Sequence, residues 1–168
     1  MKRLILMRHA KSSWSQSDLP DIDRPLDVRG RNGADGLGVW LAAQGYAPDL
    51  VIVSSASRCV ETWERVAAGL TGNPEVTTER ELYNAPSGEI RDIIRASGKG
   101  ETVLVVAHNP GIGTMARDMR VDPAPHHATF DKYPSGATTV LELPIDDWSA
   151  LDFGTAHLVD YVTPKELA

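Results

Sequence analysis

Three apolar segments of the chain are each followed by residues that could bind and transfer a phosphoryl group. Arg8 and His9 follow the first segment, Arg58 comes shortly after the second, and His108 follows the third. Arginine stays charged at any working pH and presents a planar fork of donors that matches phosphate oxygens. A histidine has an ordinary pKa of about 6.5, so much of it is neutral and nucleophilic at neutral pH. One histidine could attack phosphorus while the other donates a hydrogen bond to a phosphoryl oxygen.

The elements that must position these residues follow from the hydrophobic pattern. Short continuous apolar runs predict buried strands, and apolar residues spaced three and four apart predict helices. The predicted strands are 4–7, 49–53, 102–107, 137–143 and about 156–161, and the predicted helices are about 30–44, 56–70 and 88–96. Ligands of parallel sheets bind outside the carboxyl ends of the strands. We therefore expect the four residues to converge at one edge of the sheet.

Alternation of strand and helix along the chain predicts an α/β fold. The expected architecture is a mostly parallel central sheet with helices on both faces. The sequence contains no internal repeat, no low-complexity tract and no long linker. We therefore expect residues 1–168 to form a single domain.

Composition excludes several classes of protein. Seventeen basic and 23 acidic side chains give a net charge of −6, the opposite of a nucleic-acid-binding surface. The only cysteine is Cys59, so neither a disulfide framework nor a Cys-based zinc site is expected. The apolar run near the N-terminus is too short for a signal peptide, and no stretch approaches a membrane span. These features predict a cytoplasmic protein that binds neither nucleic acid nor membrane.

Cys59 and Arg65 have the Cys-x5-Arg spacing of cysteine phosphatases. Such a loop wraps backbone N–H groups around a phosphate, and it favours glycine over carboxylates. Here the intervening residues include two glutamates and follow a helical pattern, with Cys59 on its apolar side. We interpret Cys59 as a core thiol. Arg58 falls in the first turn of the same helix, after serines suited to capping.

Two other patterns are better explained as ordinary structure. The segment 111–116 resembles a dinucleotide fingerprint, but His108, Asn109 and Pro110 separate it from the preceding strand. The three acidic residues 21, 23 and 27 could suggest a calcium loop, but Leu26 stands where such a loop needs glycine. A solvated, turn-rich surface fits this acidic segment better.

Taken one at a time, the candidate residues also have structural explanations. Arg8 could form a surface ion pair, His9 could end a strand, and His108 could be a hydrogen-bonded structural histidine. Arg58 alone indicates little. The functional interpretation depends on all four occurring at three strand ends of one small sheet.

The segments around these four residues resemble those of a known family. The segments Leu6–Ser12, Ser54–Thr62 and Val105–Gly111 resemble the histidine phosphatase superfamily, also called phosphoglycerate mutase-like. The Arg-His pair, the Ser-x-x-x-Arg block before a helix and the second histidine after an apolar strand appear in the family's order. Two positions depart from the pattern, because Ala10 stands where glycine is commonest and Cys59 where alanine is common.

Within that superfamily the chain resembles the SixA-type branch, through Arg8–Ser12, Asp23–Leu26 and Tyr133–Gly136. The resemblance implies a three-layer α/β/α fold and a phosphatase that needs no metal or cofactor. It also implies that His9 becomes phosphorylated and that Arg8, Arg58 and His108 form the phosphate pocket. SixA-type proteins dephosphorylate phosphohistidine on signalling proteins, so a histidine phosphotransfer domain is an expected partner.

Three alternatives remain open at this stage: a small-phosphometabolite phosphatase, a mutase with the same pocket, and a non-catalytic phosphate-binding signalling module. The chain is short and has no long insertion between its elements. It should therefore leave the pocket open to phosphate carried on a protein surface or on a small phosphoester.

The general acid is predicted from the same resemblance. Many superfamily members use a carboxylate located after the helix of the second arginine, and Glu81 matches that location best. Glu89 is the competing candidate. If the leaving group is a histidine nitrogen, an acid matters less, because the P–N bond is already labile and the imidazole can leave once protonated.

Overall fold

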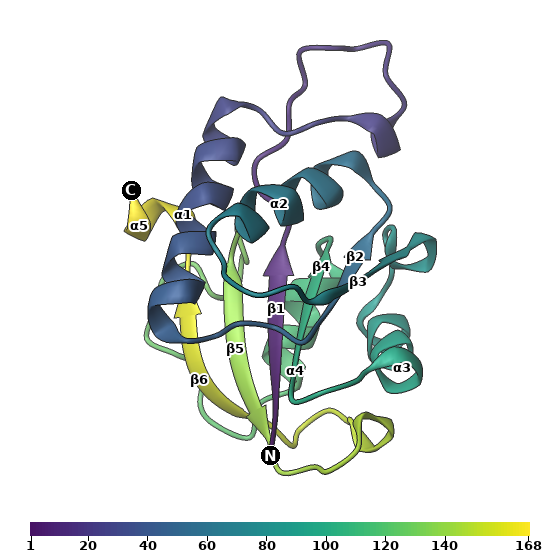
Figure 1. Ribbon diagram of the computed structural model, residues 1–168, viewed down its shortest axis with the longest axis vertical. Coiled ribbons are helices and arrows are strands. Elements are labelled where there is room, and N and C mark those ends of the chain that lie inside the picture. The colour runs from purple at the N-terminus through teal and green to yellow at the C-terminus, as the bar shows by residue number, and fades with distance from the viewer.

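The computed structural model describes residues 1–168 and places a six-stranded sheet at the centre of the molecule (Figure 1). The strand order is β3-β2-β4-β1-β5-β6. β5 alone runs opposite to the other strands, so the mostly parallel α/β sheet predicted from the sequence is confirmed. The strands are β1 (Lys2–Arg8), β2 (Leu50–Ser54), β3 (Glu75–Glu79), β4 (Thr102–Ala107), β5 (Thr138–Leu143) and β6 (His157–Val162).

The central strands are buried on both faces. Every residue of β2 and β4 is buried, as the continuous apolar runs predict for parallel strands covered by helices. In the pairing of β1 with β4, Leu6 lies beside Val105 and Arg8 beside Ala107. This register brings the ends of the two strands level, so His9 and His108 leave the sheet side by side.

Helices cover both faces and make three layers. The helices α1 (Val28–Gln44) and α2 (Ser57–Ala68) pack on one face and cross in front of the sheet in Figure 1. The helices α3 (Ser87–Ser97) and α4 (Gly111–Asp118) pack on the other face. A short α5 (Pro164–Leu167) lies against α1. Three single 3₁₀ turns complete the structure, at Asp21–Asp23, Arg80–Leu82 and Trp148–Ala150.

Local signals explain where the site-bearing helices begin and end. The carboxylate of Asp27 caps α1 by accepting a hydrogen bond from Gly30 N, and Gly45 ends this helix with a left-handed φ of 75°. The serine cap expected for α2 is not formed, because Ala56 occupies the N-cap position and α2 has no side-chain cap. Ser54 instead accepts a hydrogen bond from Ala56 N at 3.3 Å, just before the helix.

Two elements differ from the sequence expectations. The edge strand β3 was not predicted because its sequence, Glu-Val-Thr-Thr-Glu, contains one apolar residue. The helix α4 was not predicted because Gly111 and Gly113 weaken its helical pattern. The structure requires Gly111, since a Cβ there would lie 1.9 Å from the carbonyl oxygen of Ala85. No helix of the protein is both long enough and apolar enough to cross a lipid bilayer.

Candidate active site

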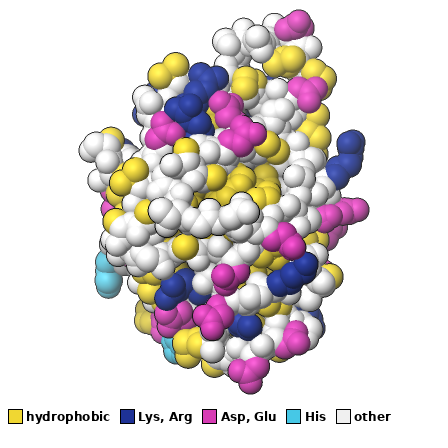
Figure 2. All heavy atoms as spheres, in the orientation of Figure 1, with side chains coloured by type: hydrophobic (Ala, Val, Ile, Leu, Met, Phe, Trp, Pro, Cys, Tyr) yellow, Lys and Arg dark blue, Asp and Glu magenta, His cyan; other side chains and the backbone are white.

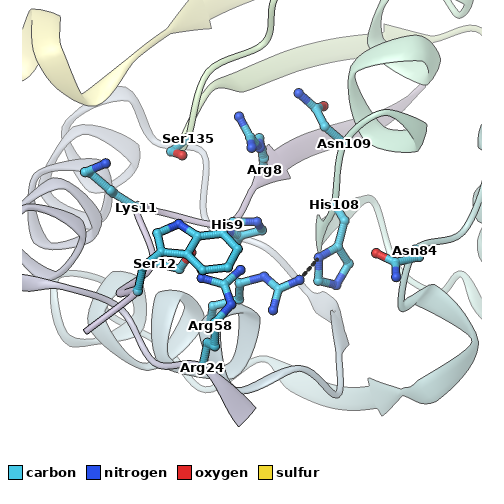
Figure 3. Close-up of a pocket in the computed structure, with 11 residues that line it drawn as sticks. Arg8, His9, Lys11, Ser12, Arg24, Arg58, Asn84, His108, Asn109 and Ser135 are labelled. Atoms are coloured by element: carbon cyan, nitrogen blue, oxygen red, sulfur yellow. Dashed lines mark hydrogen bonds between the residues drawn. The ribbon is translucent and has the colours of Figure 1, made fainter. Parts of the chain in front are cut away.

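A cavity of about 240 Å³ opens at the carboxyl ends of β1, β2 and β4 (Figure 3). The structure brings Arg8, His9, Arg58 and His108 together in its lining, as the sequence analysis expected. Two further cationic side chains, Lys11 and Arg24, also line it, together with the polar residues Ser12, Asn84, Asn109 and Ser135. No carboxylate lines the cavity, although the chain carries a net charge of −6.

His9 is held as a neutral imidazole with one defined tautomer. Its backbone N–H donates to Ala107 O at 3.1 Å, which fixes it beside the end of β4. Its Nδ1 lies 2.7 Å from Ala10 O. A carbonyl only accepts, so Nδ1 carries the proton and Nε2 keeps its lone pair. Burial lowers the pKa of His9 to about 3. His9 Nε2 is therefore available as a nucleophile across the neutral pH range.

His108 also remains neutral but has the opposite tautomer. Its Nδ1 lies 3.4 Å from Nη2 of Arg58, which can only donate, so this nitrogen accepts. Its Nε2 lies 2.7 Å from Ser54 Oγ and carries the proton. Burial and the nearby Arg58 charge lower the pKa of His108 to about 4. The His9 and His108 rings are 5.4 Å apart, between centroids, so both face the same space.

Arg58 spans the floor of the cavity and is buried. Its Nη1 donates to Asp21 O at 2.8 Å, and its Nη2 lies 3.1 Å from a carboxylate oxygen of Asp21. Its Nε is buried without an acceptor. The guanidinium is thus anchored by a loop that lies outside the sheet, while it points toward His108 (Figure 3).

Arg8 is positioned by the segment before β5. Its Nη1 donates to Tyr133 O at 3.2 Å, and Asn109 Nδ2 donates to the same carbonyl at 2.9 Å. Tyr133 adopts a left-handed φ of 49°, which is strained for an aromatic residue. A buried hydrogen bond stabilises this conformation, because the Tyr133 hydroxyl donates to Leu6 O at 2.6 Å. Like Arg58, Arg8 keeps a buried Nε without an acceptor.

Gathered positive charge makes the cavity suited to an anion, because four cationic side chains and no carboxylate line it. Burial and the charge of Arg58 lower the pKa of Arg8, which shows that the two cations repel one another. A tetrahedral oxyanion would relieve this repulsion, and its charge would be neutralised by bidentate donors.

Asp21 is the carboxylate that pairs with Arg24 and Arg58 of the cavity lining, and it is ionised. Tyr83 Oη donates a short hydrogen bond to it, and Arg24 and Arg58 bind it at 3.0 and 3.1 Å. The hydrogen bond from Tyr83, followed by those from the arginines, lowers the pKa of Asp21 to about 2. Asp21 therefore holds Arg58 in place and has no proton to donate near neutral pH.

The structure does not bring Glu81 or Glu89 to the cavity, which corrects the expected position of the general acid. Both residues are exposed, and neither lines the cavity. The 3₁₀ turn Arg80–Leu82 buries Leu82, so Glu81 faces outward beside Glu79. Burial and the Glu81 carboxylate raise the pKa of Glu79. The same chain segment contributes Asn84, a few residues later.

Several lining residues lay outside the sequence prediction. Asn84 has a left-handed φ of 57°, a conformation that asparagine tolerates better than most residues, but one sequence cannot reveal it. Asn109 follows His108 directly and could have been found by extending the strand-end rule by one residue. Asp21 was assigned to a solvated surface, and nothing in its spacing indicates the contact with Arg58. Cys59 is a buried core thiol as expected, and burial raises its pKa to about 12.

The fold and this cavity define a class of protein, an α/β protein with two histidines and two arginines at the carboxyl ends of its strands. Comparison with known sequences makes the assignment specific. The profile of the histidine phosphatase superfamily (branch 1) matches residues 4–95. The chain belongs to this superfamily, and membership supports a phosphatase activity. It is also 32% identical to the uncharacterized protein Rv1276c of Mycobacterium tuberculosis, over 95% of this chain and 100% of that protein.

Solved structures place the fold in the SixA-type branch. An Agrobacterium tumefaciens protein described as a SixA phosphohistidine phosphatase superposes with a TM-score of 0.82 and 28% identity, covering 97% of this chain and 98% of its own. A Nakamurella multipartitia protein of the same description gives 0.79 and 29%, covering 97% and 96%. The family and branch inferred from the sequence are therefore confirmed.

Proposed function

We propose that the protein hydrolyses phosphohistidine on other proteins, through a phosphohistidine intermediate on His9. The observation that carries this proposal is that no carboxylate lines the cavity. Asp21 pairs with two arginines of the lining and has a pKa lowered to about 2, so it too holds no proton for a poor leaving group. A phosphorylated imidazole needs less help, because its P–N bond is labile and its nitrogen takes a proton from water.

In the first step His9 Nε2 attacks the phosphorus atom. A bond forms between that nitrogen and phosphorus, and the bond from phosphorus to the substrate nitrogen breaks with the electron pair going to the imidazole. Arg8 and Arg58 neutralise the equatorial oxygens, where the transition state carries its charge. His108 donates to one of these oxygens through Nδ1, after that nitrogen takes up the proton that the entering phosphoryl monoanion carries.

In the second step water attacks the phosphorus of phospho-His9. The P–N bond breaks, inorganic phosphate leaves, and the neutral imidazole is restored. The hydrogen bond from His9 Nδ1 to Ala10 O keeps Nε2 directed at the cavity through both steps. Because the proton on Nδ1 never leaves, the attacking nitrogen is always the same one.

A substrate panel tests the proposal. We expect kcat/KM to be highest for a peptide that carries phosphohistidine, lower for p-nitrophenyl phosphate, and lowest for a phosphoserine peptide, whose alkoxide leaving group needs an acid. A small phosphometabolite with far higher kcat/KM than any phosphopeptide would favour the small-molecule alternative. Absence of turnover on every substrate would favour the non-catalytic module.

The covalent step has its own test. Alkaline quenching during turnover should trap phosphate on His9, in a form stable to base and labile to acid. We expect His9→Ala to abolish both the trapped phosphate and turnover, and Arg58→Ala to leave a trace of activity with weakened phosphate binding. His126→Ala is the matched control, because His126 is exposed and does not line the cavity. Undiminished turnover by His9→Ala would overturn the mechanism.

A further inference from the structure

A second and larger cavity adjoins the first one. It has a volume of about 650 Å³ and lies between α1 and the segment that contains α5. The two cavities share Lys11 and Ser135 in their linings. In Figure 3 these two residues lie on the side of the phosphate cavity opposite His108 and Asn84. We call the second cavity the basic groove. It extends from Lys11 and Ser135, at the edge of the first cavity, toward α1 and α5.

All charged side chains that line the basic groove are cationic. Lys11, Arg29 and Lys165 line it, all three are exposed, and no acidic side chain lines it. None of the three forms an ion pair within the protein. This contrasts with the net charge of −6 and with the face in Figure 2, where acidic and basic side chains are interspersed.

The carboxylates nearest in sequence to these cations are already engaged. Asp27 accepts a hydrogen bond from Gly30 N at 2.8 Å and caps α1. Glu166 accepts hydrogen bonds from Thr163 N at 2.9 Å and from its hydroxyl at 3.1 Å, and it also contacts His127. The positive charge of the groove is therefore available to a binding partner.

The walls of the groove indicate what kind of partner fits. They include Pro134, Pro164 and Leu167, which can contact aliphatic side chains, and no aromatic side chain on which a nucleobase could stack. The groove is more than twice the volume of the phosphate cavity, so it exceeds what a single phosphate needs. A polypeptide with acidic and aliphatic side chains matches both its charge and its surface.

We propose that the basic groove binds an acidic, extended segment of the phosphoprotein substrate, adjacent to its phosphorylated residue. This inference rests on the proposed function, because it assigns the phosphate cavity to the phosphorylated side chain and the groove to its flanking residues. Lys11 stands at the junction between the two. Exposed charges of this kind mainly speed association and set partner choice. The groove thus supplies the selectivity that an open phosphate cavity lacks.

A peptide-binding measurement tests the groove independently of phosphate hydrolysis. The probes are two labelled, unphosphorylated peptides of equal length, one with Asp and Leu alternating and one with Asn in place of each Asp. We expect the acidic peptide to bind more tightly, and the double variant Arg29→Glu/Lys165→Glu to weaken its binding by about tenfold. Added salt should weaken it too. Equal affinity of the two peptides for the unaltered protein would overturn the proposal.

A matched charge reversal controls for long-range electrostatics. Lys99 is exposed, pairs with Glu75 at 2.9 Å and precedes β4, at the end of the sheet away from the site. We expect Lys99→Glu to leave peptide binding unchanged. If the double variant melts at a lower temperature than the parent, Arg29→Gln/Lys165→Gln repeats the test with smaller changes. If Lys99→Glu lowers the affinity for the acidic peptide as much as the double variant does, the peptide does not bind specifically in the groove.

Kinetics separates this proposal from the proposed function. With the same two peptides carrying one phosphohistidine, the groove variants should raise KM for the acidic peptide and leave its kcat and p-nitrophenyl phosphate turnover unchanged. If the acidic peptide binds but its phosphohistidine is not hydrolysed, the proposed function fails and the groove stands. If both peptides are hydrolysed with equal kcat/KM, the groove fails and the proposed function stands.

Discussion

His108 carries its proton on the nitrogen that faces away from the cavity, which constrains how it can assist. In the substrate-free protein Nδ1 accepts from Arg58, and Nε2 donates to Ser54 Oγ at 2.7 Å. A phosphoryl oxygen needs a donor, so the proton must appear on Nδ1 when the anion enters. A serine hydroxyl both donates and accepts, so Ser54 can reverse its hydrogen bond and support either tautomer. We therefore assign Ser54 as a positioning residue for His108.

Replacement of Ser54 by alanine should lower kcat while leaving His9 phosphorylation possible. We expect a fall of about 10- to 100-fold, less than the roughly 10²–10³-fold loss when a whole oxyanion donor is deleted. Ser54→Thr keeps the hydroxyl and should restore most of the activity. Ser55→Ala is the matched control, because the Ser55 hydroxyl is buried without a partner.

Imidazole ¹⁵N NMR reports which ring nitrogen of His108 carries the proton. This tautomer would not change on ligand binding if Ser54 had only a structural role. The spectrum should place the His108 proton on Nε2 in the free protein and on Nδ1, or on both nitrogens, when tungstate is bound. An unchanged tautomer on tungstate binding would contradict the assigned role of Ser54.

Asp21 affects the same site through its charge. The carboxylate holds Arg58 but also repels an incoming phosphate. Asp21→Asn keeps an acceptor for Arg58 and removes the negative charge. We expect inorganic phosphate to inhibit roughly fivefold more tightly, about 1 kcal/mol, as is usual for a half-exposed charge.

Asp23→Asn is the control for this change, because Asp23 is exposed in the same 3₁₀ turn and does not line the cavity. Competitive inhibition of p-nitrophenyl phosphate turnover measures the effect. Weaker inhibition by phosphate in Asp21→Asn would mean that the grip on Arg58 matters more than the charge.

At the scale of elements, the contact between α1 and the segment after β1 positions His9. Asp27 N donates to Lys11 O at 3.1 Å, and Gly30 lies directly over the same carbonyl. A Cβ on Gly30 would stand 2.0 Å from Lys11 O, so only glycine allows the helix to approach this closely. The loop that leaves His9 is thereby fixed against the first turn of α1.

Two glycine substitutions in α1 should have opposite effects on stability. Gly30→Ala must separate α1 from Lys11 and should destabilise the protein by about 1–3 kcal/mol or more, with a loss of kcat. Gly36→Ala should stabilise it by about 0.5–1 kcal/mol, because its Cβ would meet only Leu167 at 3.9 Å and alanine favours helix. Urea denaturation measures both changes. Equal effects from the two substitutions would rule out the close contact as the reason for glycine at position 30.

The elements also show how far sequence reasoning reaches. Buried parallel strands are continuous apolar runs, so β1, β2 and β4 were predicted, and the residues at their ends followed from the rule for parallel sheets. Asp21 and Tyr133 act through contacts between segments distant in sequence, and such contacts leave no local pattern. That Glu81 lies outside the cavity lining could not be predicted, because its place depends on the orientation of a short 3₁₀ turn, which is set by burial of Leu82.

At the scale of the whole molecule, two buried neutral histidines link stability to pH. The pKa is about 3 for His9 and about 4 for His108 in the folded protein, against roughly 6.5 in an unfolded chain. Between these values the unfolded state binds more protons than the folded state. The free energy of unfolding therefore rises with pH in this window and falls as the solution is acidified. Asp21, with a pKa of about 2, acts at lower pH, where its protonation removes a further contribution.

We expect the free energy of unfolding to decrease from about pH 6.5 toward pH 4, with a limiting slope of up to about 1.4 kcal/mol per pH unit for each histidine. Urea denaturation at pH 7, 6 and 5 measures it. The double variant His9→Gln/His108→Gln cannot take up these protons, so its profile should be flatter than that of the parent. His126→Gln is the control, because His126 is exposed and does not line the cavity. Parallel profiles for the parent and the double variant would show that the acid sensitivity arises elsewhere, and that burial does not hold the two imidazoles neutral.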